Sequence, residues 1–226
     1  KTIIIKNKIM KKITVLLSAF VFMASAFAQL ENTKWKSTIT IDGPVNVIFH
    51  FKKTTVDLYR IADNSLIESM SYTHNDTSFT LKKISGQSDC DDAIPGKYRY
   101  VLMPKTLLLK VITDNCGDRS SVIDKTQWSA WKDPVEVKVS DAVLKQYAGT
   151  YQMDAQHPII LTLENGILYA EGPNNQLPKS PLIPESNTQF FLRIAGIRWD
   201  FIKDTKGNVT TLISHEAKDY ELKKVK

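Results

Sequence analysis

The chain has 226 residues, of which 42% are hydrophobic and 24% are charged, with a formal net charge of +6. Five lysines and no acids fall in residues 1–28, so the remaining 198 residues carry 25 basic and 24 acidic residues, a net charge of +1. The high whole-chain isoelectric point therefore does not indicate a nucleic-acid partner, and we expect none.

The first 28 residues have the pattern of a leader and signal peptide. Met10 is followed by two lysines and by an uncharged apolar run over 13–28 that ends in Ala-Phe-Ala. A basic start, an apolar stretch shorter than a membrane span and small residues before the cleavage point favour a signal peptide over a membrane anchor or a buried helix. We expect cleavage before Gln29, a periplasmic or secreted protein, and no membrane span in the mature chain.

The mature chain has two cysteines, Cys90 and Cys116. Because exported proteins meet an oxidising compartment, we predict a disulfide between them rather than two free thiols. The bond would close a loop of 27 residues.

Most of the mature chain reads as short strands. Alternating or continuous apolar runs separated by turn residues predict strands at 38–41, 45–51, 56–61, 78–81, 98–102, 107–113, 149–153, 158–163, 167–170, 190–194, 198–202, 209–215 and 220–224. Ser140 is placed to cap a short helix over 141–147. Brief strands at this spacing are typical of a β-sandwich or a β-barrel, so the chain is predicted to be all-β.

A break at Lys132-Asp133-Pro134 divides these strands into two groups. We predict one domain over 29–133 and a second over 134–226, each with roughly eight strands and at most one short helix. Closing each sheet into a small barrel would remove the unpaired backbone groups at its edges.

The second half carries an ordered set of motifs. They are Tyr147-x-Gly149-x-Tyr151, Leu161-x-Leu163-x-Asn165-Gly166-x-Leu168, Pro181-Leu182-x-Pro184-Glu185-Ser186-x-Thr188-x-Phe190-Phe191 and Phe201-x-x-Asp204-x-x-Gly207-x-Val209-Thr210-x-Leu212. Over these residues the chain resembles the lipocalin-like domain of unknown function found C-terminal to penicillin-binding-protein-like (β-lactamase-related) serine hydrolases. The resemblance implies a lipocalin-like β-barrel that works beside a catalytic domain.

The first half resembles bacterial lipocalin-like proteins, so that the whole chain is expected to be two lipocalin-like antiparallel barrels in tandem. The motifs that carry the resemblance are Thr33-Lys34-Trp35 and Cys90…Pro95-Gly96-x-Tyr98-x-Tyr100…Leu107-x-Leu109…Asp114-x-Cys116-x-x-Arg119. It implies that Trp35 plugs the barrel floor under Arg119, in a cation–π contact. The alternative is that Trp35 is ordinary core and Arg119 a solvated turn residue. Tyr151 stands where the opening motif would recur in the second barrel.

Aromatic residues of the second half are the candidates for contact with a ligand or a partner protein: Phe190, Phe191, Trp199 and Phe201. At strand spacing such residues are more often core. Because Phe190 and Phe191 are adjacent, one must point into the barrel and the other outward. An outward phenylalanine would contact the other domain or a partner protein.

No catalytic, cofactor or metal motif stands out. Ser129-Ala130-Trp131-Lys132 fits Ser-x-x-Lys, but it falls at a predicted strand end without the helix that brings the lysine under the serine. The acidic run Asp89-Cys90-Asp91-Asp92 is better explained as a surface loop than as a calcium site.

We therefore expect a non-enzymatic, exported binding protein without a cofactor or a metal. It would bind a small apolar ligand inside a barrel or a protein partner. The alternatives are an accessory protein acting in trans on a periplasmic serine hydrolase, and a hydrolase that uses Ser129. A cavity of about 300 Å³ or more inside a barrel would favour the small ligand.

Overall fold

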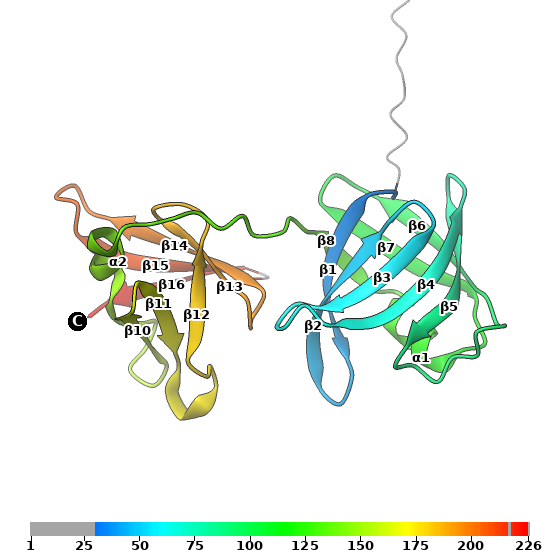
Figure 1. The fold of residues 1–226 in the computed structure, drawn as a ribbon, viewed down its shortest axis with the longest axis horizontal. Coiled ribbons are helices and arrows are strands. Elements are labelled where there is room, and N and C mark those ends of the chain that lie inside the picture. The colour runs from blue at the N-terminus through cyan, green and yellow to red at the C-terminus, as the bar shows by residue number, and fades with distance from the viewer. Residues whose placement is uncertain (1–29, 217, 226) are drawn as a thin grey trace, which may run out of the picture.

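The computed structural model describes residues 30–216 and 218–225, and this part of the chain forms two closed antiparallel barrels joined by an extended segment (Figure 1). The predicted all-β fold with two barrels in tandem is confirmed. The predicted signal peptide lies outside the described residues. Neither α-helix of the described part is long and apolar enough to cross a membrane.

The first barrel is an up-and-down meander in which each strand pairs with the next and the last pairs with the first. Its closing seam joins Trp35 to Ala130 and Lys36 to Ser129. Closure leaves no free sheet edge, which is how small antiparallel sheets avoid pairing with other chains. In chain order its elements are β1 (Thr33–Thr40), β2 (Pro44–Phe51), β3 (Thr55–Arg60), β4 (Leu66–His74), β5 (Ser78–Gly86), β6 (Gly96–Leu102), β7 (Thr106–Thr113), α1 (Gly117–Ile123) and β8 (Gln127–Ala130).

The second barrel has the same meander order and closes through β16 and β9, where Lys224 pairs with Tyr151. In chain order its elements are α2 (Asp141–Tyr147), β9 (Gly149–Gln152), β10 (Pro158–Glu164), β11 (Ile167–Glu171), the 3₁₀ turn η1 (Pro173–Asn175), β12 (Ser180–Pro184), β13 (Gln189–Leu192), β14 (Ile197–Lys203), β15 (Val209–His215) and β16 (Asp219–Lys224). The first barrel's strands end at Ala130 and the second's begin at Gly149, while the domain boundary at 133/134 stays a prediction.

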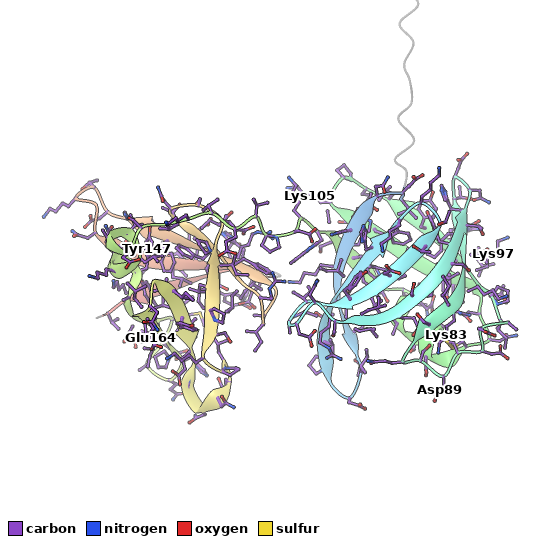
Figure 2. The ribbon with its side chains drawn as sticks, in the orientation of Figure 1. Lys83, Asp89, Lys97, Lys105, Tyr147 and Glu164 are labelled. Carbon is purple, nitrogen blue, oxygen red and sulfur yellow. A yellow bond between two sulfur atoms is a disulfide. The ribbon has the colours of Figure 1, made fainter. Side chains whose placement is uncertain are left out.

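Each barrel has its own core. Side chains alternate in and out along the strands, as in β6, where every second residue is buried. The first core contains a group of aromatic rings in mutual contact: Phe49, Phe51, Tyr72, Phe79, Tyr98, Tyr100 and Trp128. Lys105, in the β6–β7 turn, lies at one end of this barrel, and Lys83 and Asp89 lie at the other end (Figure 2).

The short helix predicted over 141–147 is confirmed as α2. Ser140 precedes it with extended backbone, and its carbonyl accepts a helical hydrogen bond from the Leu144 amide at 3.0 Å, but its hydroxyl does not cap the helix as predicted. Asp141 in the first turn and Lys145 in the last turn suit the helix dipole. Tyr147 anchors the helix to the barrel, because its ring stacks on Phe201 with the centroids 4.2 Å apart.

Three strands and one α-helix escaped the sequence patterns: β4, β8, β12 and α1. The alternation of β4 is broken by a bulge at Ile67, which lies between the partners of Tyr59 and Leu58 on β3. In β8 only Trp128 is buried, and β12 begins and ends near prolines at 181 and 184. α1 has seven residues and no side-chain cap, so it depends on its tertiary contacts rather than on local sequence.

The barrels touch through a small apolar contact of their own. Phe191, on the outer side of β13, packs against Ile48 and Ile61 of the first barrel and against Trp131 of the connecting segment. Two polar contacts border it, from Asn46 Nδ2 to the Ala195 carbonyl at 2.9 Å and from Lys36 Nζ to the Gly196 carbonyl at 2.5 Å. The connecting segment therefore bridges two barrels that are already in contact.

Candidate ligand-binding site

The first barrel contains a cavity of about 350 Å³ beneath α1. This volume exceeds about 300 Å³, the size expected to favour a small ligand, and it lies at the lower end of the range for ligand pockets. The cavity takes its lining from the end of β1, the β1–β2 turn, β2, β3, β4, the loop after β5, and α1. The lining residues are Ile39, Thr40, Ile41, Asp42, Phe49, Leu58, Ile67, Glu68, Met70, Gln87, Ser88, Asp118, Arg119, Ser121, Val122 and Ile123.

The deeper walls of the cavity are apolar. Phe49, Leu58 and Met70 are buried and project inward from three consecutive strands, β2, β3 and β4. Phe49 also stacks on Trp128 of the core, with the ring centroids 5.1 Å apart. Ile123 closes the side formed by α1. These walls suit an apolar molecule because burial of its surface is favourable by about 25 cal/mol per Å².

A buried carboxylate lies at the polar end of the cavity. Glu68 has the same inward phase on β4 as Met70 and Tyr72 and is 7% exposed. Its Oε1 accepts a hydrogen bond from the Ser88 hydroxyl at 2.6 Å, and its Oε2 accepts one from the Ser88 amide at 3.3 Å. Gly86 lies opposite with φ +140°, and a Cβ at this position would stand 2.0 Å from Glu68 Oε2. The glycine therefore leaves the space that the carboxylate occupies.

A buried ion pair fixes α1 to the end of β7. Arg119 donates from Nε to Asp114 Oδ2 at 2.7 Å and from Nη2 to Asp114 Oδ1 at 2.8 Å, and Nη2 also donates to the Ile94 carbonyl at 3.0 Å. The Tyr98 hydroxyl donates to the same carboxylate. Burial alone would raise the pKa of Asp114, but the hydrogen bonds from Arg119 and Tyr98 outweigh it and hold the pKa below its ordinary value. Arg119 Nη1 is buried and has no hydrogen-bond partner within the described residues.

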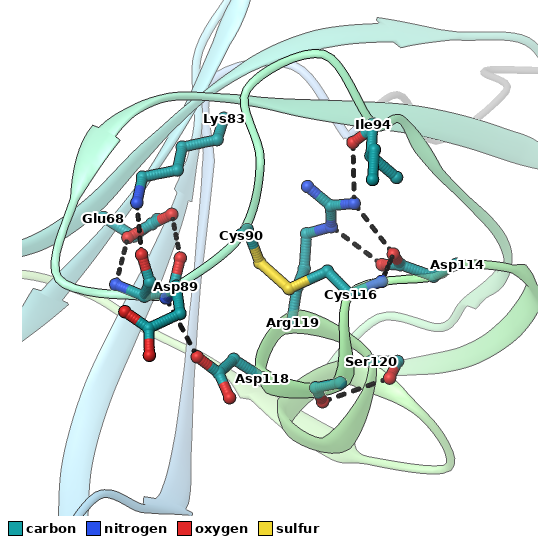
Figure 3. Close-up of a disulfide and its surroundings, with 12 residues drawn as sticks. Glu68, Lys83, Asp89, Cys90, Ile94, Asp114, Cys116, Asp118, Arg119 and Ser120 are labelled. Atoms are coloured by element: carbon teal, nitrogen blue, oxygen red, sulfur yellow. Dashed lines mark hydrogen bonds and ion pairs between the residues drawn. A yellow bond between two sulfur atoms is a disulfide. The ribbon is translucent and has the colours of Figure 1, made fainter.

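The disulfide lies beside this ion pair and ties the loop after β5 to the start of α1 (Figure 3). Cys90 and Cys116 have their Cα atoms 5.4 Å apart and are bonded, in agreement with the predicted pairing. The Asp89 amide donates to Asp118 Oδ2 at 3.0 Å, and the Cys116 amide donates to Asp114 Oδ1 at 2.8 Å. The helix that covers the cavity is thus held by one covalent and several polar links.

Trp35 and Arg119, the residues predicted to form a barrel floor, lie apart. Trp35 is buried near the start of β1, and its Nε1 donates to Thr33 Oγ1 at 2.7 Å. Arg119 lies on α1, which covers the cavity beside the far end of β1, and its guanidinium is paired with Asp114. Among the described residues no cation–π contact joins the two. The expectation that Arg119 lies over Trp35 is wrong, because a buried guanidinium gains more from a two-point carboxylate pair than from an aromatic face.

Tyr151, the third floor candidate, is buried in the second barrel. Its hydroxyl donates to the Tyr147 carbonyl at 2.9 Å, which links β9 to the end of α2. Lys224 Nζ lies 5.6 Å from the centroid of the Tyr151 ring, so this residue does have a cation over its face.

The four aromatic candidates for ligand or partner contact are all buried. Phe190 and Phe201 meet edge to face in the second core, with the centroids 5.4 Å apart. Trp199 is in the same core, and its Nε1 donates to Ser214 Oγ at 2.9 Å. Phe191 points outward, as one of the adjacent pair must, and covers the contact with the first barrel. These four residues therefore form core and inter-barrel contact and present no aromatic face to solvent.

The remaining sequence candidates fall outside any cluster. Ser129 is exposed on β8, and Lys132 follows in the connecting segment, so no helical turn brings the two together. The described residues contain no group of three or more His, Cys, Asp or Glu side chains placed to hold a metal ion, and this range includes Asp89, Asp91 and Asp92.

Glu68 and its partner Ser88, the main polar features of the cavity, were not among the residues predicted from sequence. A signal was available, because Glu68, Met70 and Tyr72 share one strand phase, which places a carboxylate on an inward face. The bulge in β4 at Ile67 hid that phase. The cavity itself depends on how α1 covers the barrel end, which no local pattern encodes.

The comparisons with known proteins concern the second barrel. A family model described as a domain of unknown function, DUF3471, matches residues 133–225, which contain α2 and all strands from β9 to β16. The chain has no significant match among curated proteins. Over residues 133–225 the chain is therefore similar to the DUF3471 domain of unknown function, and its two closed antiparallel barrels fit a lipocalin-like fold.

Proposed function

We propose that the protein binds a small, largely apolar ligand in the cavity of the first barrel, and that it acts as an exported, non-catalytic binding protein. The observation that carries the proposal is the cavity of about 350 Å³ between the apolar walls and α1. In the second barrel the corresponding interior is occupied by the rings of Tyr147, Tyr151, Phe190 and Phe201. Export is supported by the predicted signal peptide and by the disulfide, since stable disulfides belong to oxidising compartments.

A neutral fluorescent probe, N-phenyl-1-naphthylamine, tests the cavity. We expect saturable binding at one site per chain with an increase and blue shift of fluorescence. Leu58→Phe places a larger side chain in the cavity, while Leu108→Phe makes the same change on the outer face of β7, where Leu108 is exposed. The first variant should weaken probe binding about tenfold or more, and the second should leave it unchanged. Equal binding by all three proteins, or no saturable binding, would overturn the proposal.

Export has its own test. Expression of the chain with residues 10–28 in a secreting bacterial host should release a protein whose N-terminus is Gln29 and whose two cysteines are oxidised. Retention of the full-length chain in the cytoplasm with free thiols would contradict export.

A second candidate function concerns the second barrel. The match over 133–225 and the resemblance to domains found beside penicillin-binding-protein-like serine hydrolases support an accessory role in trans on such an enzyme. Addition of the purified protein to a periplasmic serine hydrolase that lacks its own C-terminal domain should change the hydrolysis rate in proportion to complex formation. No co-purification and no change in rate would exclude this role.

An esterase activity of the protein that disappears in Ser129→Ala would instead overturn the non-catalytic assignment.

A further inference from the structure

The cavity has an unbalanced charge at its polar end. Glu68 is buried and uses two hydrogen bonds, both from Ser88, although a carboxylate can accept about four. Within residues 30–216 and 218–225, Glu68 takes part in no ion pair. The neighbouring Lys83 directs its ammonium to the Ser88 carbonyl (Figure 3). A buried carboxylate without an ion-pair partner is unfavourable, so this position favours a positively charged group that contacts it directly.

The other charges that line the cavity have the same sign or are already balanced. Asp42 and Asp118 are two further acids of the lining. Arg119 is the single base among the lining residues, and Asp114 binds it through both carboxylate oxygens. The lining therefore has a negative balance, and an anionic ligand would meet repulsion from three carboxylates.

The free Nη1 of Arg119 is the strongest argument for an anionic ligand, because a buried donor without an acceptor is unfavourable. The positive charge of Arg119 is nevertheless neutralised by Asp114, whereas the negative charge of Glu68 has no such partner. Nη1 can be satisfied by any neutral oxygen. The charge balance, which acts over the whole cavity, decides in favour of a cation.

We propose that the ligand of the first barrel is a small amphipathic amine, whose protonated amino group binds the Glu68 carboxylate and whose apolar part lies against Phe49, Leu58 and Met70. This inference rests on the proposed ligand-binding function and specifies its ligand class. Charged hydrogen bonds between ammonium and carboxylate are stronger than neutral ones, so the amine should be selected over neutral molecules of the same shape.

Three ligands of equal chain length test the inference by displacement of N-phenyl-1-naphthylamine at pH 7: octylamine, octan-1-ol and octanoate. Octylamine should displace the probe at a concentration about tenfold or more below that of octan-1-ol, and octanoate should be the weakest. In Glu68→Gln the ratio between octylamine and octan-1-ol should fall to about one. Glu221→Gln, which removes an exposed acid of the second barrel, should keep the wild-type ratio.

The outcomes separate the two proposals. If the probe does not bind the wild-type protein, the proposed cavity function fails. If the probe binds but octylamine shows no preference, or octanoate is the best competitor, the amine inference is wrong and the cavity function stands. The comparison of the three ligands on wild-type protein needs no variant, so it decides the inference even if Glu68→Gln does not fold. Ser88→Ala leaves the carboxylate in place and should keep the preference for octylamine.

Discussion

Arg119 and Asp114 form a two-point ion pair whose side chains are 4% and 0% exposed, and this pair joins α1 to the end of β7. The helix that covers the cavity therefore depends on a buried electrostatic contact. A contact of this kind is more sensitive to loss of one partner than an exposed pair is, because the remaining charge stays buried without compensation.

Asp114→Asn should lower the free energy of unfolding of the first barrel by about 3–5 kcal/mol at pH 7, since it leaves the Arg119 charge buried and unpaired. Urea denaturation followed by circular dichroism measures the loss. Glu221→Gln is the control, because it breaks an ion pair with Lys223 in which both side chains are 64% exposed. We expect a change below about 1 kcal/mol for this control. A similar small change in Asp114→Asn would contradict a structural role of the buried pair.

The stability difference between the wild-type protein and Asp114→Asn should depend on pH, because the pKa of Asp114 is lowered in the folded protein. A carboxylate whose pKa is lower in the folded state stabilises the protein above its unfolded-state pKa, about 3.9 for aspartate, and the contribution is lost as pH falls toward the folded-state value. The stabilities of wild-type protein and Asp114→Asn should therefore converge below about pH 4. A difference that grows on acidification would have the wrong sign.

Removal of the disulfide should destabilise the same end of the barrel. The double variant Cys90→Ala, Cys116→Ala releases a 27-residue loop, and we expect a loss of about 3–4 kcal/mol. Thermal unfolding with and without dithiothreitol measures the effect: the reductant should lower the midpoint of the wild-type protein and leave that of the double variant unchanged. Equal midpoints for the oxidised wild type and the double variant would show that the bond contributes no stability.

His215 gives the second barrel a pH dependence of opposite sign. Burial lowers its pKa, but hydrogen bonds to Asp219 at 2.9 Å and Asp200 at 3.0 Å outweigh this, so the pKa is raised above 6.5. The stabilisation by protonated His215 is therefore fully present below about pH 6.5 and is lost as pH rises through the pKa of His215 in the folded state. Because the His215 side chain is 35% exposed, we expect an effect below about 1 kcal/mol.

The measurement compares wild-type protein with His215→Asn from pH 5 to pH 9, by urea denaturation and by NMR titration of the imidazole. The variant should be the less stable protein at pH 5, and the difference should shrink toward pH 9. Asp200→Asn combined with Asp219→Asn should bring the imidazole titration down to a lower pH. An unchanged titration in this double variant would rule out the two carboxylates as its cause.

Phe190 and Phe191 form a matched pair of neighbours with different partners. Phe190→Ala removes a ring from the second core and should destabilise that barrel by about 3–5 kcal/mol. Phe191→Ala removes the ring that contacts Ile48, Ile61 and Trp131, so it should loosen the barrels from each other. Limited proteolysis of the connecting segment over 132–139 should be faster in Phe191→Ala and unchanged in Phe190→Ala under conditions in which both remain folded. Identical cleavage rates would contradict the different roles.

The sequence alone determined the class of the fold. Alternating residues on many short segments predicted an all-β chain, because each strand must bury one face. Ser140 predicted α2 over 141–147, although its hydroxyl makes no capping hydrogen bond. The presence of two cysteines predicted a disulfide between them, because no third cysteine in the sequence competes for the pairing. The adjacent phenylalanines predicted one inward and one outward ring, since successive side chains of a strand point to opposite faces.

The tertiary structure alone decided where the candidate site lies. The aromatic residues that looked like a binding face became the core of the second barrel and its contact with the first, because burial of large rings is most favourable where strands from distant parts of the sequence meet. The family resemblance predicted that Arg119 lies over Trp35. In the structure Arg119 pairs with Asp114, five residues before it, because α1 folds back over the end of the barrel. Glu68 became a cavity residue because its inward phase on β4 and the position of α1 bring both into the same lining. Cavity volume and charge balance are sums over many strands, so they follow from closure of the barrel and not from any local pattern.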